Sequence, residues 1–127
     1  MNRKAFTLVE ILLVVGIIAL LATIAIPNLL RSRLSANESS AQSTLKTIST
    51  ALESYYVTNN NYPNNTNLLI GDVPPYLNKD FFVGSYSGYS YTSNLGDYYY
   101  TITATPVSAS TGLHTFTITT GAVLQQL

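Results

Sequence analysis

The chain has 127 residues, of which 46% are hydrophobic and only 9% are charged, and its six basic residues balance its six acidic residues. This length allows one compact domain with an appendage, and the neutral balance gives no electrostatic sign of a surface that binds nucleic acid. The chain contains no cysteine, which excludes disulfide bonds and thiolate metal sites, so its stability must come from packing.

The chain begins with an apolar segment that is long enough to cross a membrane. Residues 11–30 contain no charged residue and would form a helix about 30 Å long, which matches the hydrocarbon thickness of a bilayer. Glu10 stands at the start of this segment. A carboxylate in hydrocarbon costs about 2.5 to 3.5 kcal/mol, so the sequence indicates a functional role for Glu10.

The helical pattern continues beyond the apolar segment without a turn signal. Apolar residues recur along one face at steps of seven, four, three, four and three: Leu34, Ala41, Leu45, Ile48, Leu52 and Tyr55. The pattern predicts an amphipathic helix over residues 31–58. Because no turn separates the two parts, we expect one helix from about Phe6 to about Val57.

Proline residues mark a weak point in this helix and its end. Pro27 lacks the N–H that would bond to Thr23 O, and Gly16 weakens the helix before it, so a kink or local opening is expected between them. The helix is predicted to end within residues 58–65, where asparagines favour turns and Pro63 disfavours helical backbone in the residue before it.

The rest of the chain predicts a connector and a small sheet. The connector covers residues 59–84 and is irregular, with one helical turn near Leu68. Strand patterns then follow at residues 85–92, 97–105 and 114–120, separated by turn-rich segments at 93–96 and 106–112. Such short separators favour a meander of neighbouring antiparallel strands.

Alternation along the strands predicts which face of the sheet is buried. Apolar and aromatic residues share that face: Tyr98, Tyr100, Ile102 and Ala104 on one strand, and His114, Phe116 and Ile118 on the next. A small sheet needs a cover, which the apolar stripe of the helix can supply. We therefore predict an α+β fold, with a long N-terminal helix packed on a three- to four-stranded antiparallel sheet within residues 85–123.

The apolar segment is also compatible with two simpler kinds of N-terminal helix. A basic start followed by an apolar run describes a secretory signal peptide, with a cleavage site at Thr23-Ile24-Ala25 and a secreted enzyme starting near Ile26. Glu10, the length of the run and the uninterrupted helical pattern oppose a signal peptide. A single-pass membrane anchor that carries an outward binding domain keeps the helix continuous but gives Glu10 no role.

One stretch of the sequence resembles a known family. KAFTLVEILLVVGIIALLATIAIPNLL, within residues 4–35, is similar to the amino terminus of type IV pilins and of type II secretion pseudopilins. The shared pattern is a short basic leader, a small residue, Phe, Thr, Leu, an aliphatic residue and Glu, followed by an unbroken apolar helix. YYVTNNNYP at the helix end, and YTITATP and FTITTGAV as closing strands, resemble the family in layout.

The resemblance implies processing by a prepilin peptidase and N-methyltransferase. This enzyme would cut between Ala5 and Phe6 and methylate the new amino group of Phe6. The family usually has glycine before the cut, so the β-carbon of Ala5 is expected to slow cleavage. Glu10 would then pair with the Phe6 amine of a neighbouring subunit and set its register. Gly16 and Pro27 lie where filaments of this family often loosen the helix.

The resemblance also implies a domain organisation and a role. Residues 1–5 would be the leader, 6–30 the transmembrane and filament-core segment, and 31–127 the head domain. The chain would be a structural subunit and no enzyme, held in the inner membrane and polymerised with identical or related subunits by an inner-membrane assembly platform into an extracellular filament. The alternative is a minor pilin or a pseudopilin of a periplasmic pseudopilus. Adhesion, motility, DNA uptake and secretion are the roles left open.

No other part of the sequence predicts a catalytic, cofactor or metal site. His114 is the single histidine and is expected to be a partly buried or edge side chain of a strand. Asp72, Asp80 and Asp97 are too scattered for a calcium loop. Major pseudopilins commonly carry such a loop and a proline-tryptophan-glycine signature, and the absence of tryptophan favours a pilin. The ten tyrosines are expected to pack in the core and sheet.

Overall fold

The computed structural model describes residue 1 and residues 4–127 of the chain, so part of the predicted leader, residues 2–3, lies outside the described residues. The described chain divides into two units, Met1–Arg33 and Leu34–Leu127. The first unit holds the apolar segment, and the second holds the sheet and the residues packed against it.

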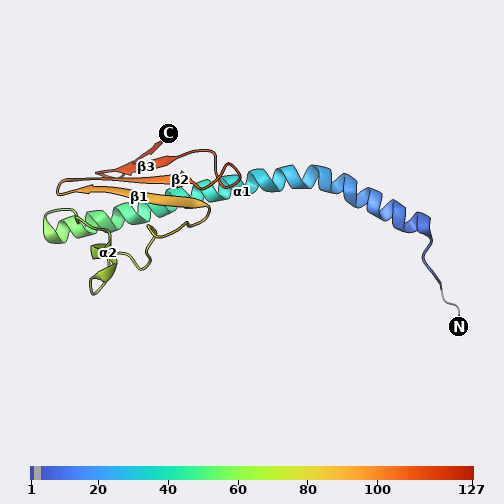
Figure 1. Cartoon of the computed structure of the whole chain (residues 1–127), viewed down its shortest axis with the longest axis horizontal. Helices are drawn as coiled ribbons and strands as arrows, with labels where there is room; N and C mark the ends of the chain where they lie inside the picture. Colours follow the sequence, from blue (N-terminus) through green and yellow to red (C-terminus); the bar gives the residue numbers. More distant parts are fainter. Residues whose placement is uncertain (2–3) are drawn as a thin grey trace. The chain divides into compact units, whose positions relative to one another are not determined.

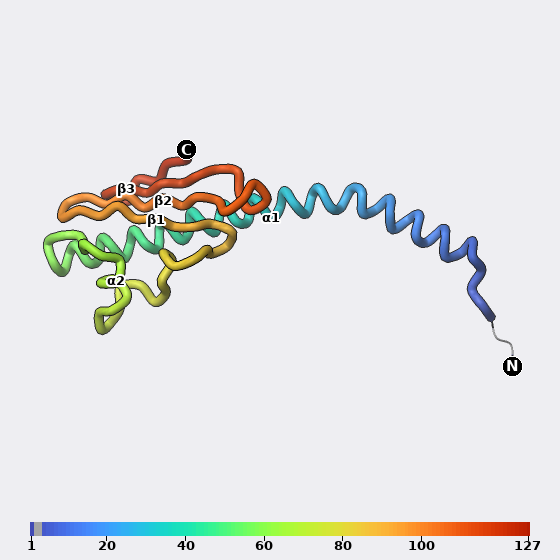
Figure 2. Tube along the Cα trace, viewed as in Figure 1, coloured from blue at the N-terminus to red at the C-terminus, as the bar shows by residue number. Residues whose placement is uncertain are grey.

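The predicted long helix is confirmed. Helix α1 spans Leu8–Asn59, 52 residues, and each end lies two residues from its expected position. The helix continues through Gly16 and Pro27, and the tube in Figure 2 is an unbroken coil over this range. The kink expected between these two residues stays a prediction.

Helix α1 ends where the run of asparagines begins. Asn60 has a left-handed backbone with φ of 57°, and its N–H donates to Tyr56 O at 2.8 Å, which satisfies a carbonyl of the last turn. Tyr62 follows and is buried in the core. The connector then forms the short helix α2, Asn67–Gly71, which confirms the helical turn expected near Leu68.

Four strands form one antiparallel sheet, in the order β1-β2-β3-β4, and the first three are labelled in Figure 1. The strands are β1 Tyr89–Gly96, β2 Tyr99–Pro106, β3 Phe116–Thr119 and β4 Val123–Gln126. Each strand pairs with the next one along the chain, as expected for a meander. The predicted α+β fold is therefore confirmed, and β4 carries the sheet three residues past the predicted end at residue 123.

The position predicted for the first strand and its following turn is wrong. Ser87 and Gly88 have positive φ values of 51° and 77°, so a tight turn precedes β1 where the strand was expected to begin. Residues 93–96, expected as a turn, belong to β1, where Gly96 pairs with Tyr99 of β2. Cross-strand pairing overrides the turn preference of serine, asparagine and glycine in this segment.

The turn between β1 and β2 falls at Asp97 and Tyr98 instead. Tyr98 is 75% exposed and does not share the buried face with Tyr100, because it lies outside the paired ladder. His114 also lies outside its predicted strand, in the loop before β3. Its side chain is partly exposed, as expected.

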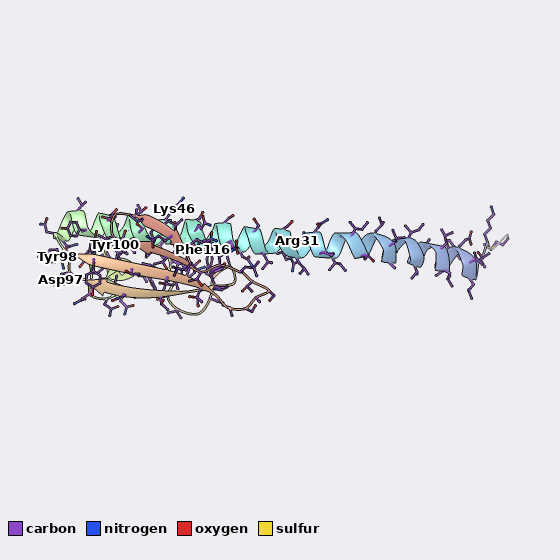
Figure 3. All side chains as sticks on the ribbon, turned by 90° about the horizontal axis from the view of Figure 1, so that it is seen from above. Arg31, Lys46, Asp97, Tyr98, Tyr100 and Phe116 are labelled. Atoms are coloured by element: carbon purple, nitrogen blue, oxygen red, sulfur yellow. The ribbon has the colours of Figure 1, made fainter. Side chains whose placement is uncertain are left out.

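The core lies between one face of α1 and the inner face of the sheet. Figure 3 shows the labelled Tyr100 and Phe116 on strands that run alongside the second half of α1. The helix contributes Ala41, Leu45, Ile48, Ala51 and Leu52, and the strands contribute Tyr89, Tyr91, Tyr100, Ile102, Ala104, Phe116 and Ile118. Each fully buried leucine or isoleucine contributes about 1.5 to 3 kcal/mol, so this contact holds the head domain together.

Candidate functional site

The residues on either side of the predicted cleavage point lie outside α1. Ala5 and Phe6 have no regular secondary structure and both are exposed, Phe6 by 83%. Exposed chain segments without hydrogen-bonded structure are the preferred sites of proteolysis. The Ala5–Phe6 bond is therefore accessible without unwinding the helix.

Thr7 and Glu10 form a reciprocal cap at the start of α1. The Thr7 N–H and the Thr7 hydroxyl each donate to Glu10 Oε2 at 2.8 Å, and the Glu10 N–H donates to Thr7 Oγ1 at 3.3 Å. This arrangement is a capping box, in which two side chains satisfy backbone donors that have no partner inside the helix. The carboxylate also lies at the positive end of the helix dipole.

Thr7 was not among the predicted site residues, although the sequence carries a signal for it. Thr7-Leu8-Val9-Glu10 has the pattern Ser/Thr-x-x-Glu before an apolar run, which marks a capping box. The cap gives Glu10 a local role in the single chain. It also keeps the carboxylate hydrogen-bonded, which lowers the cost of holding it in apolar surroundings.

The cap and the cleavage residues share one surface depression. Lys4, Ala5, Phe6 and Glu10 line a cavity of about 250 Å³. Both hydrogen bonds that Thr7 donates are accepted by Oε2 of Glu10. Within residues 4–127, no group donates a hydrogen bond to Oε1 of Glu10. The carboxylate thus offers one oxygen to a further donor beside the residue that would carry the new amine.

Beyond the cap, α1 presents apolar side chains without protein cover. The large hydrophobic residues from Leu8 to Leu30 are exposed, and α1 is long and apolar enough to cross a membrane by length and composition. Gly16 and Pro27 lie in this part of the helix. A Cβ at Gly16 would meet nothing within 4 Å, so packing inside the chain does not require glycine there.

The remaining candidate residues, His114 and three aspartates, lie in the second unit of the chain. His114 Nδ1 lies 3.0 Å from Glu38 Oε1 on α1, a side-chain contact at the head surface. Asp72, Asp80 and Asp97 do not gather into a metal-binding group within the described residues. Among the residues that the structure describes, no three His, Cys, Asp or Glu side chains gather closely enough to hold a metal ion.

Two protein families match different parts of the chain. The prokaryotic N-terminal methylation motif matches residues 1–26, and the family described as type IV minor pilin ComP, DNA uptake sequence receptor, matches residues 27–120. Fold and motif together define an α+β protein with a membrane-compatible N-terminal helix and a methylation motif. The chain belongs to the family of type IV pilins and type II secretion pseudopilins.

Three relatives illustrate the likeness. The type IV wide pilus major component PilA4 of Thermus thermophilus is 44% identical over 69 residues, 54% of this chain and 53% of that protein. The type IV major pilin protein PilA of Myxococcus xanthus is 38% identical over 61 residues, 48% and 28% of the two chains. The type II secretion system core protein G of Pectobacterium carotovorum is 36% identical over 62 residues, 49% and 40%. The matches span about half or less of these relatives.

Proposed function

We propose that this chain is a structural, non-enzymatic subunit of a type IV pilus-like extracellular filament. The observation that carries the proposal is the capped Glu10 at the start of an uncovered apolar helix. Such a helix is compatible with lipid before assembly and with other apolar helices after it, so one segment serves as membrane span and filament core. The head, residues 31–127, faces away from the cytoplasm.

Processing of the leader is the first step. A prepilin peptidase cuts the exposed bond between Ala5 and Phe6, which releases residues 1–5, and the new Phe6 amine is methylated. The bond between Phe6 and Thr7 stays intact, so the Thr7 N–H that donates to Glu10 is retained. The capping box therefore survives the cut.

The second step is the pairing of Glu10 with the Phe6 ammonium of a neighbouring subunit. The Phe6 amine of the same chain, four residues before Glu10, is the competing partner. Opposite charges attract strongly in apolar surroundings, and a carboxylate left unpaired there is costly. A subunit that enters the filament in the wrong axial register therefore leaves Glu10 unpaired, which costs free energy. This cost favours the correct register.

A role as a DNA receptor is not part of the proposal. The description of the matching family names a DNA uptake sequence receptor, but the head, residues 31–127, carries four basic residues, Arg31, Arg33, Lys46 and Lys79, against five acidic ones. Affinity for DNA comes largely from lysine and arginine side chains that neutralise phosphates. A pseudopilin is the second candidate, favoured by the 36% identity to a core protein G.

Mass spectrometry of the mature amino terminus tests the processing step. A chain that begins with N-methylated Phe6 supports the proposal. An intact Met1 would instead indicate a plain membrane anchor, and a start near Ile26 would indicate a secreted protein. Either of these two results would contradict the proposal that the chain is a filament subunit.

Two matched variants separate the charge of Glu10 from its cap. Glu10→Gln keeps a side chain that can complete the capping box but removes the charge, whereas Thr7→Ala removes the cap and keeps the charge. We expect Glu10→Gln subunits to reach the membrane and to be cut, and the yield of sheared filaments to fall strongly. Thr7→Ala should reduce yield less, and Thr7→Ser should behave as wild type. Normal filament yield from Glu10→Gln would contradict the register mechanism.

A further inference from the structure

A polar pocket lies at the end of the head domain where β1 meets the segment after α1. It has a volume of about 230 Å³ and is lined by Asn64, Asn65, Thr66, Ser93, Asn94 and Leu95. We propose that this pocket, which we call the amide pocket, binds a neutral saccharide. The proposal does not depend on whether the chain assembles into a filament.

The two walls of the amide pocket are held together by contacts of the core. The Tyr62 N–H donates to Asp97 O at 2.9 Å, which joins the segment after α1 to the β1–β2 turn. The ring of Tyr62 also packs edge-on against Tyr100 of β2, with centroids 5.0 Å apart. Tyr62 and Pro63 are buried. Asn64 directly follows these two buried residues, so its position is fixed by the core. The pocket is therefore part of the folded head.

The chemistry of the lining matches a ligand rich in hydroxyl groups. Asn65 Oδ1 accepts the Asn67 N–H at 3.0 Å, which fixes that side chain and leaves its amide NH₂ free to donate. Within the described part of the chain, the side chains of Asn64, Ser93 and Asn94 make no hydrogen bond. Amides and hydroxyls offer both donors and acceptors, as sugar hydroxyls require. Because β1 is an edge strand, alternate residues of it also present backbone N–H and C=O groups.

The amide pocket lies beside the β1–β2 hairpin. Leu95 of the pocket wall comes two residues before Asp97 of the turn, and Figure 3 places Asp97 and Tyr98 at the tip of this hairpin, by the carboxyl end of α1. Leu95 pairs with the buried Tyr100, whereas the exposed Tyr99 faces the other side of the sheet, so the pocket offers polar contacts and no aromatic ring.

Charge and size disfavour phosphate-bearing and drug-sized ligands. The six lining residues include no charged side chain, so phosphate groups of nucleotides or DNA would find no counter-charge. The volume is below the roughly 300 to 1,000 Å³ of sites for drug-sized ligands. A single sugar ring of a neutral oligosaccharide fits both properties.

Binding of oligosaccharides by the full chain tests the proposal. The chain is held in a zwitterionic detergent, because the head groups of glycoside detergents would compete. Chitotriose, lactose and maltotriose are titrated to about 10 mM while side-chain amide signals of asparagine are followed by NMR. The variant Asn64→Ala/Asn94→Ala removes two amides, and Asn78→Ala, an exposed asparagine of the connector, is the matched control. Near-UV circular dichroism checks that each variant is folded.

We expect at least one of the three saccharides to bind saturably. The double variant should bind it about tenfold more weakly, the loss expected for two hydrogen bonds, and Asn78→Ala should bind as wild type. No saturable binding of any of the three saccharides would overturn the proposal. Equal affinity of the double variant and wild type, or tighter binding of a DNA duplex than of any saccharide, would overturn it as well.

Discussion

His114 Nδ1 lies 3.0 Å from Glu38 Oε1, which joins two residues separated by 76 positions in the sequence. The Leu113 N–H donates to the same Glu38 oxygen at 3.1 Å, and Asn37 Nδ2 donates to Thr111 O at 2.8 Å. These three contacts hold the loop between β2 and β3 against α1 at the start of the head domain.

The Glu38 contact predicts a loss of stability in acid. Burial acts to raise the pKa of Glu38, but the bonds from Leu113 and His114 outweigh it and lower the pKa below its ordinary value of 4.5. The carboxylate therefore stabilises the fold above pH 4.5, and this contribution disappears as the pH falls through the lowered pKa. Wild type should exceed Glu38→Gln in stability by about 1 kcal/mol at neutral pH, and this difference should shrink as the pH falls below 4.5.

Urea unfolding of the full chain in detergent measures this difference. All ten tyrosines lie within residues 55–100, so near-UV circular dichroism reports on the head domain. Asp72→Asn changes an exposed carboxylate outside this cluster and serves as the control. If Glu38→Gln and Asp72→Asn show the same pH profile, the Glu38 contact does not stabilise the head.

Tyr62 predicts a loss of stability in alkali. Burial, followed by the nearby negative charge of Glu53, raises the pKa of Tyr62 to about 12 from the ordinary 10.0. Folding therefore favours the neutral phenol, and its stabilising effect is intact below pH 10 and is lost as the pH rises to about 12. In Tyr62→Phe the stability of the head should fall less steeply as the pH rises, because phenylalanine cannot ionise.

The urea concentration at the unfolding midpoint, measured at several pH values between about pH 8 and pH 12, gives the slope of stability against pH. Tyr98→Phe is the matched control, since Tyr98 is 75% exposed and should leave the slope as in wild type. An equal slope for wild type and Tyr62→Phe would show that Tyr62 does not ionise in the unfolding transition.

The buried stripe of α1 predicts a large difference between two residues of the same helix. Leu52 is fully buried against the sheet, whereas Val57 is 81% exposed. Leu52→Ala should lower the free energy of unfolding of the head by about 2 to 5 kcal/mol, because it leaves a cavity. Val57→Ala should change it by less than about 0.5 kcal/mol. Similar effects of the two variants in urea unfolding would mean that α1 does not pack on the sheet as described.

We expect the residue before the predicted cut to affect the rate of processing. Ala5 is exposed and non-helical, so its β-carbon should act on the fit to the peptidase and not on the fold of the substrate. With the chain and a prepilin peptidase expressed together, we expect Ala5→Gly to be cut faster than wild type and Ala5→Val more slowly. The ratio of uncut to cut chain in a pulse-chase experiment measures this. Three equal rates would show that this position does not contact the peptidase.

Much of this fold could be predicted because its signals are local. The helical period from Leu34 to Tyr55 located the face of α1 that packs on the sheet. The pattern Thr7-x-x-Glu10 contained the cap, although the sequence analysis did not use it. The errors occurred where local preference and pairing disagree, as at Gly96, whose place in β1 follows from its partner Tyr99 in β2.

By itself the sequence determined the length and polarity of α1, the lone acid at its start and the order of the strands, since these depend on neighbouring residues and helical or strand periodicity. Only the tertiary structure decided which distant side chains meet. Glu53 of α1 accepts hydrogen bonds from Tyr100, 47 positions away, and from the Gly121 N–H, 68 positions away. The pairing of Glu38 with His114 is of the same kind. Such contacts form only when the sheet packs on the helix, so no spacing in the sequence encodes them.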